Sequence, residues 1–155
     1  MDVCPPASPA AGADAAVLTD HRQVVLPQGC IGLEVPQTSA QFQQGLMQRP
    51  ALDPWRGMWF RFEPARPVGF WMKNCLAPLD LVFTRDGQVV GIEAGVPPCA
   101  ANPCPTYRSP GPVDGVIELR AGRAKELGIK PGSPATPLPG STGLGAYRQP
   151  AASPD

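Results

Sequence analysis

Residues 70–80 read FWMKNCLAPLD, and this stretch decides the fold of the chain. The aromatic and apolar residues before Asn74 predict a β-strand, and the apolar run that begins at Leu79 predicts another. The residues between them end in Pro78, so they read as a tight corner joining the two strands. Lys73 and Asp80 flank the corner, which places opposite charges on either side of it.

The rest of the sequence predicts a mainly β domain. Strands are expected at residues 31–35, 57–62, 68–74, 79–85, 88–94 and 113–119. Asp86 and Gly87 form a strong two-residue hairpin signal. One short helix is expected from Thr38 or Ser39 to Met47, and another over residues 121–127. The fold class is therefore mainly β (α+β), a small antiparallel β-barrel-like or strongly twisted sheet domain with two short helices.

Composition divides the chain into three parts. Residues 1–29 read as a Pro/Ala-rich flexible leader, residues 30–132 as a single β-rich domain, and residues 133–155 as a disordered Pro/Ser/Gly-rich tail. The formal net charge is zero and no Lys/Arg run is present, so we expect no nucleic-acid partner. No apolar run is long enough to span a membrane. No apolar segment typical of an export signal is visible after Met1, but a Pro/Ala-rich leader often lies between such a signal and a domain.

A register for the sheet follows if each connector between consecutive strands is a hairpin loop. In that register Lys73 faces Asp80, Asp80 faces Glu93, and Trp59 faces Trp71 in the next row. Cross-strand neighbours lie roughly 5 Å apart on one face of a sheet. We therefore expect two carboxylates and a lysine to meet beside a pair of tryptophans, on the face opposite the apolar core.

This predicted row has a structural and a functional interpretation. In the structural one, Lys73 is simply the counter-ion of Asp80. In the functional one, the row is a concave polar site in which Asp80, Glu93 and Lys73 are candidate catalytic residues for acid/base chemistry. The same groups could instead bind a hydroxyl-rich ligand, with Trp59 or Trp71 as a platform.

The five cysteines cannot all pair within the chain because their number is odd. Cys99 and Cys104 either form a disulfide, worth about 2 kcal/mol for so short a loop, or stay reduced. Export would favour the disulfide. Cys4 reads as a linker residue, with a lipid-anchor cysteine of a longer precursor as the alternative. The single histidine, His21, lies in the leader, so we expect neither a metal site nor a cofactor.

A series of short motifs runs through the chain in order. These are QGLMQR at 44–49, GMWF at 57–60, FWMKN at 70–74, PLD at 78–80, PCPTY at 103–107, SPG at 109–111 and VIEL at 116–119. Over about residues 33–131 they resemble the family catalogued as domain of unknown function 192 (DUF192). Cys75 departs from the family pattern, which usually has Thr there, so a hydroxyl is lost at the corner.

The resemblance implies a small β-rich, barrel-like domain of the kind found in bacterial and archaeal proteins with export signals or membrane anchors. It implies no reaction. It does select polar motif positions as candidate site residues: Lys73, Asn74, Asp80, Tyr107, Ser109 and Glu118.

We therefore expect a monomeric, extracytoplasmic β-domain that is secreted or envelope-associated, with a cytoplasmic location as the alternative. Its expected role is a non-enzymatic binding module for a small polar or carbohydrate-like ligand or a protein partner. The alternatives are a hydrolase or isomerase using Asp80 and Glu93, and a structural accessory domain. The predicted binding residues are Trp59, Trp71, Lys73, Asn74, Asp80, Glu93, Tyr107, Ser109 and Glu118.

Overall fold

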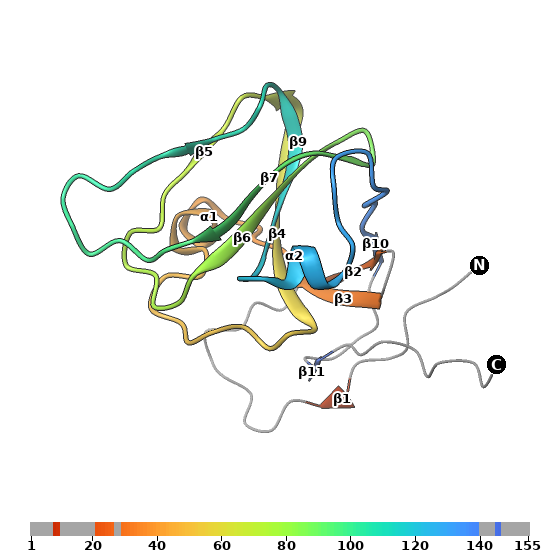
Figure 1. The fold of residues 1–155 in the computed structure, drawn as a ribbon, viewed down its shortest axis with the longest axis horizontal. Helices are drawn as coiled ribbons and strands as arrows, with labels where there is room; N and C mark the ends of the chain where they lie inside the picture. Colours follow the sequence, from red (N-terminus) through yellow and green to blue (C-terminus); the bar gives the residue numbers. More distant parts are fainter. Residues whose placement is uncertain (1–7, 10–20, 27–28, 140–144, 147–155) are drawn as a thin grey trace.

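An open, strongly twisted sheet forms the centre of the chain in a computed structural model that describes residues 8–9, 21–26, 29–139 and 145–146 (Figure 1). The elements, in chain order, are β1 (Ser8–Pro9), β2 (His21–Leu26), β3 (Gly29–Glu34), α1 (Ser39–Gln44), β4 (Arg56–Arg66), β5 (Gly69–Phe70), β6 (Leu79–Arg85), β7 (Gln88–Val96), β8 (Tyr107–Arg108), β9 (Val113–Arg120), α2 (Arg123–Glu126), β10 (Leu138–Pro139) and β11 (Gly145–Ala146). The predicted fold class is confirmed in its twisted-sheet form; the sheet does not close into a barrel.

The main sheet has seven strands in the order β10-β2-β3-β4-β9-β6-β7. Its β3–β4 pair is parallel and its other pairs are antiparallel. Two short ladders, β1–β11 and β5–β8, lie outside it. After α2 the chain runs along β7, where Val89 N–H donates to Ser133 O at 2.9 Å and Gly132 N–H donates to Val89 O at 2.8 Å. It then continues into β10, so one segment connects the two edges of the sheet.

β9 is an inner strand of the sheet, between β4 and β6. Its sequence, VDGVIELR, is almost continuously buried, as expected for a strand covered on both faces. Alternation along the strand sends Val116 and Glu118 to one face and Ile117 and Leu119 to the other. β9 therefore contributes to two separate apolar layers.

Each face of the sheet carries its own apolar cluster. The first cluster contains Ile117 and Leu119 and is covered by Ala124 and Leu127 at α2. The second contains Val116 and receives aromatic side chains from α1, β4, β5 and β8. α1 and the β5–β8 arm thus cover the face on which Glu118 lies (Figure 1).

Local sequence signals predicted the turn and the first helix correctly. Thr38 caps α1 in a capping box, because its side chain accepts from Gln41 N–H while the Gln41 side chain accepts from Thr38 N–H. The hairpin at Asp86-Gly87 forms, and both residues adopt positive φ. The helix ends earlier than predicted, at Gln44, since Gly45 leaves the helical region.

The predicted hairpin register is wrong beyond the Asp86-Gly87 turn. β4 pairs with β9 and not with the strand expected at 68–74, of which only Gly69–Phe70 is a strand, paired with β8. A bulge between Phe83 and Thr84 shifts β6 against β7, so that Leu81, and not Asp80, pairs with Glu93. The physical reason is that the apolar β9 pairs between β4 and β6, a long-range pairing that no local turn signal encodes.

The ordered strands reach beyond residues 30–132, since β2 and β10 both join the main sheet. Most of the predicted leader and tail, with Cys4, lies outside the described residues. Cys99 and Cys104 form a disulfide in the long β7–β8 loop, and Cys30 is disulfide-bonded as well. Among the described residues, Cys75 is the cysteine that remains free.

We predict that replacing both loop cysteines, Cys99→Ser with Cys104→Ser, lowers the free energy of unfolding by about 2 kcal/mol, because the closed loop is short. Urea unfolding of the oxidised protein measures this. Cys75→Ser is the control and should change stability by less than about 1 kcal/mol. A loss well above the predicted value would mean that the loop holds more of the domain together than its length implies.

Candidate functional site

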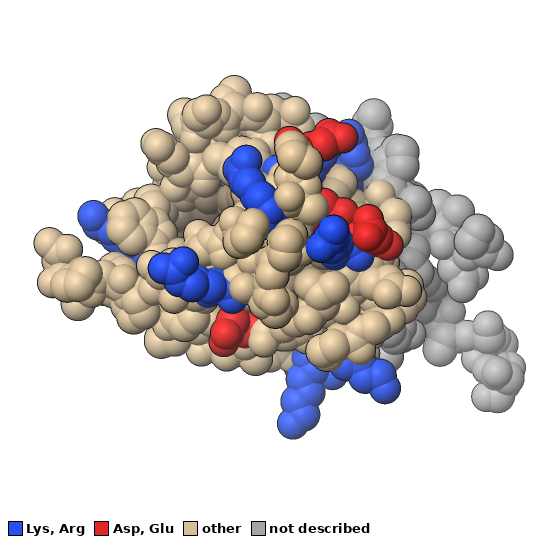
Figure 2. All heavy atoms as spheres, turned by 90° about the horizontal axis from the view of Figure 1, so that it is seen from above, with Lys and Arg blue, Asp and Glu red and all other residues tan. Residues whose placement is uncertain are grey.

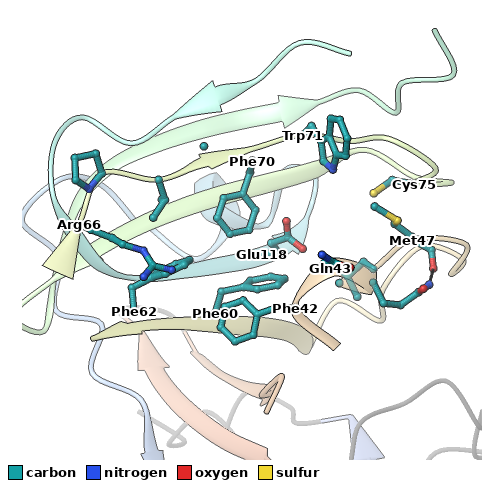
Figure 3. Close-up of a pocket in the computed structure, with 16 residues that line it drawn as sticks. Phe42, Gln43, Met47, Phe60, Phe62, Arg66, Phe70, Trp71, Cys75 and Glu118 are labelled. Carbon is teal, nitrogen blue, oxygen red and sulfur yellow. Dashed lines mark hydrogen bonds between the residues drawn. The ribbon is translucent and has the colours of Figure 1, made fainter. Parts of the chain in front are cut away.

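A pocket of about 380 Å³ opens between α1, β4, β5 and the corner after β5. Figure 3 shows its aromatic walls and the Glu118 carboxylate pointing into the open cleft between them. The lining residues are Phe42, Gln43, Gln44, Gly45, Leu46, Met47, Phe60, Phe62, Arg66, Pro67, Val68, Gly69, Phe70, Trp71, Cys75 and Glu118. Sequence alone had selected two of them, Trp71 and Glu118.

Edge-to-face aromatic contacts build the walls. Phe42 on α1 packs against Phe60 and Phe62 on β4, with ring centroids 5.6 and 5.8 Å apart. Phe70 on β5 packs against the same two rings at 5.0 and 6.3 Å. Such offset contacts give aromatic clusters a defined geometry. Four rings from three elements therefore form a continuous apolar surface around the pocket.

Glu118 enters this pocket from the most rigid part of the fold. It pairs across the sheet with Met58 on β4 and with Leu81 on β6. Both partners are fully buried, so Glu118 occupies a position of the apolar layer where a hydrophobic residue would be expected. Its side chain is only 4% exposed.

No other side chain or backbone group in the described part of the chain forms a hydrogen bond or ion pair with the Glu118 carboxylate. Burial raises the pKa of Glu118 from its ordinary value of 4.5 to about 8. The neighbouring Cys75 thiol has its pKa raised to about 11, first by burial and then by the charge of Glu118. At neutral pH the pocket therefore contains a protonated carboxyl and an unreactive thiol.

The other two buried carboxylates of the sheet region are fully partnered. Glu34 receives a bidentate hydrogen bond from Arg49, 2.8 Å at each oxygen, and a further one from Arg56 at 3.1 Å. Asp80 accepts from three backbone N–H groups, those of Gly95, Gly122 and Ala124, at 2.8, 3.1 and 2.9 Å. Glu118 differs from both, because its oxygens face a pocket and not a partner.

Hydrogen bonds outside the main sheet hold the pocket walls in place. Gln48 N–H donates to Asn74 O at 2.8 Å, which joins the turn after α1 to the corner after β5. Cys99 N–H donates to Met72 O at 3.2 Å, which ties the disulfide loop to the same corner. Ser109 Oγ accepts from Val68 N–H at 3.0 Å and fixes β5.

The family model described as DUF192, Uncharacterized ACR, matches residues 23–136. The chain belongs to the DUF192 family. A solved structure of a proposed transcription regulator from Sinorhizobium meliloti 1021 is similar at 34% identity and a TM-score of 0.70, covering 78% of this chain and 96% of that one. A solved structure of a protein of unknown function from Novosphingobium aromaticivorans DSM 12444 is similar at 32% identity and a TM-score of 0.69. The match covers 84% of this chain and 93% of that one. Among curated proteins, none matches.

In this DUF192 domain the predicted row of Lys73, Asp80 and Glu93 does not form. Asp80 is fully buried, and its oxygens hold the start of α2 and the bend of β7. Glu93 is exposed and pairs with Leu81. Lys73 is exposed on the corner, where its Nζ lies 5.2 Å from the centroid of the Trp71 ring.

The tryptophans lie on different faces and do not form the predicted pair. Trp59 packs against the first apolar cluster, with the Arg61 guanidinium 5.4 Å from its ring centroid. Trp71 lines the pocket and is 49% exposed, so it forms part of the rim. The remaining candidates support the walls: Tyr107 pairs with Phe70 across β5–β8, Asn74 shapes the corner with φ of 61°, and Ser109 fixes β5.

The residues that sequence reasoning missed are the phenylalanines of the walls, together with Gln43 and Arg66. Aromatic residues on strands and helices read as ordinary core. One signal was present: Glu118 is an acidic residue at an inward position of the apolar run VIEL. In the described residues, no cluster of three or more His, Cys, Asp or Glu could hold a metal ion. None of the described helices is long and apolar enough to cross a membrane.

We predict that the stability of the domain falls as pH rises between about 4.5 and about 8. In that window the folded state retains the Glu118 proton that the unfolded chain has released, so unfolding becomes easier by on the order of 1 kcal/mol per pH unit. Urea unfolding across this range measures the slope. Glu118→Gln, which cannot ionise, should flatten it, and an unchanged slope in that variant would show that Glu118 titrates normally.

We predict that Asp80→Asn lowers the free energy of unfolding by about 2–4 kcal/mol, because an NH2 group replaces one of the two accepting oxygens and cannot accept from the backbone N–H that it faces. Glu93→Gln, on the exposed surface, is the matched control and should change stability by less than about 0.5 kcal/mol. Thermal and urea unfolding measure both variants. Equal stabilities for the two variants would contradict the role of Asp80 in holding the backbone N–H groups of β7 and of the start of α2.

Proposed function

We propose that this DUF192 domain is a binding module that holds a small ligand in the Glu118 pocket. The ligand has an apolar body, which contacts the phenylalanine walls, and a polar group, which contacts the Glu118 carboxyl. The observation that carries this proposal is the buried carboxyl without a partner, which points into a cavity. A group of this kind in an apolar pocket is the usual signature of a binding site.

The energetics support a ligand partner for Glu118. Burying a polar group without a hydrogen bond costs roughly 1–3 kcal/mol, and burying an ionised carboxylate costs more. Glu34 and Asp80 show that this fold provides partners for carboxylates that it buries. The Glu118 oxygens reach the pocket space and are not among the fully buried unpartnered atoms of the described residues, so a ligand that bonds to Glu118 would give the carboxyl the partner that the protein itself does not supply.

The pocket supports a different ligand from the predicted sugar-like one. Its volume of about 380 Å³ lies in the range of small-molecule sites. Most of its lining residues are apolar, with four phenylalanines among them, whereas a sugar needs many hydrogen-bonding partners. Polar side chains lie at few lining positions, namely Gln43, Gln44, Arg66 and Glu118.

Catalysis by an acid/base pair of Asp80 and Glu93 has no support in this geometry, because the oxygens of Asp80 bind three backbone N–H groups. A second candidate function uses Glu118 as a general acid, since its pKa of about 8 lies near neutral pH. The Cys75 thiol would not be its nucleophile, because its pKa is raised to about 11.

The charge distribution bears on the description of the Sinorhizobium relative as a proposed transcription regulator. Figure 2 shows basic and acidic side chains interspersed on one face of the molecule, without a large patch of one sign. The chain also has a formal net charge of zero. This pattern does not favour contact with a phosphate backbone, and it supports a small-molecule role for this chain.

We also propose an extracytoplasmic location. The Cys99–Cys104 disulfide and the bonded state of Cys30 support it, because disulfides persist mainly in oxidising compartments. Alkylation of protein taken directly from cells, followed by mass spectrometry, tests this proposal. Labelling of Cys99 and Cys104 as free thiols would contradict it.

A thermal-shift screen of small molecules tests the binding function. A pocket ligand should stabilise the wild type by about 3 kcal/mol at a hundredfold excess over its Kd. Trp71→Ala, which alters the rim, should weaken this effect, and Glu118→Gln should change it most. Glu93→Gln is the control and should respond as the wild type does. Ligands that stabilise all four proteins equally would bind elsewhere and contradict the proposal.

A further inference from the structure

The geometry points to a small organic cation as the ligand, an ammonium group attached to an aromatic or aliphatic body. This inference rests on the proposed binding function and names the chemical class that the pocket selects. It depends on three features of the pocket: the unpartnered carboxyl of Glu118, the aromatic walls and the position of the one basic lining residue.

The carboxyl is the first feature. Glu118 is the acidic residue among the lining residues, it is 4% exposed, and it points into the cavity (Figure 3). In this fold the other buried glutamate, Glu34, is matched with the positive charge of two arginines. A cation from the ligand would give Glu118 the same kind of charge-assisted partner.

The aromatic walls are the second feature. Phe42, Phe60 and Phe70 form an edge-to-face group beside Glu118, and Trp71 lies at the rim. Aromatic faces attract cations by about 0.5–2 kcal/mol each, most strongly where water is excluded. The chain already uses such contacts at this rim, where Lys73 Nζ lies 5.2 Å from the Trp71 ring centroid. The Glu118 carboxyl and the aromatic rings thus both favour a positive charge on the ligand.

The charged and titratable groups around Glu118 do not oppose this assignment. From β4, Arg66 lines the pocket, but it is exposed and its guanidinium lies over the Phe62 ring, 5.0 Å from the centroid. From the corner, Cys75 contributes a neutral thiol. α1 contributes Phe42 and Gln43, and the β6 neighbour of Glu118 is Leu81. Within the described pocket lining, no basic group reaches the carboxyl to neutralise it.

Binding of a cation would release a proton. The free protein holds Glu118 protonated at neutral pH, because burial raises its pKa to about 8. An ammonium ligand binds the ionised form, so its apparent affinity should rise about tenfold per pH unit up to that pKa. A neutral ligand that bonds to the protonated carboxyl would show no such dependence in this range.

Three probes of similar shape and different charge test the inference: benzylamine, benzyl alcohol and benzoate. Isothermal titration calorimetry in two buffers of different ionisation heat gives the affinity and the protons released. We expect benzylamine alone to bind at millimolar concentration, with close to one proton released per ligand near neutral pH. Its affinity should rise about tenfold between about pH 6 and about pH 7.

Variants separate the inference from the proposed function. Glu118→Gln should lose benzylamine binding at least tenfold, and the exposed Glu93→Gln should retain it. The proton release of the wild type tests the same point if Glu118→Gln is too unstable to study. Binding of benzylamine without proton release, or equally to Glu118→Gln, would overturn the inference.

The remaining outcomes are also decisive. In one of them, benzyl alcohol or benzoate is instead the preferred probe, with binding that Trp71→Ala weakens. That result would overturn the inference that the ligand is a cation, and it would leave the pocket as the binding site. Absence of binding by all three probes at millimolar concentration would overturn the inference and count against the proposed function as well.

Discussion

The pairing of β9 with both β4 and β6 is the constraint on which the rest of the structure depends. It gives the sheet a centre that is buried on both faces and divides the apolar side chains into two clusters. It also fixes Glu118 between Met58 and Leu81, in a layer that is otherwise apolar. Backbone ladders on both sides of β9 prevent the strand from turning this side chain toward solvent. The position of the carboxyl in the pocket is therefore a consequence of the sheet order.

The three buried carboxylates show how the fold handles charge in its interior. Glu34 is neutralised by arginines and Asp80 is bound by backbone N–H groups at the start of α2, so both stabilise local structure. Glu118 has no such partner and keeps its proton at neutral pH instead. Burying a carboxyl to which no protein group bonds costs free energy. Its presence in the central strand is thus better explained by a function than by folding.

Local signals in the sequence were reliable, and long-range ones were not. The Asp86-Gly87 turn, the Thr38 cap and the mainly β class follow from residues that lie close together along the chain. The predicted row of Lys73, Asp80 and Glu93 failed because it assumed that neighbouring strands pair, whereas β9 pairs between β4 and β6. The bulge at Phe83 then shifted the remaining register. The pocket itself could not be predicted, since its walls come from α1, β4 and β5, and only their packing brings them together.

The polar and apolar parts of the pocket belong to different elements of the fold, and this has a physical consequence for ligand selectivity. Glu118 is held by the central strand, whereas the facing walls belong to α1 and to the corner after β5, which are joined by the single Gln48 to Asn74 backbone bond described above. Local opening is cheapest where few backbone bonds must break. The α1 and corner side of the pocket should therefore move more easily than Glu118 and the β4 phenylalanines, which belong to the main sheet. A fixed carboxyl with one more adjustable wall selects first for the polar group of a ligand and only then for the shape of its body. On this argument, ligands with different apolar bodies should bind to this pocket as long as they carry the polar group that Glu118 recognises.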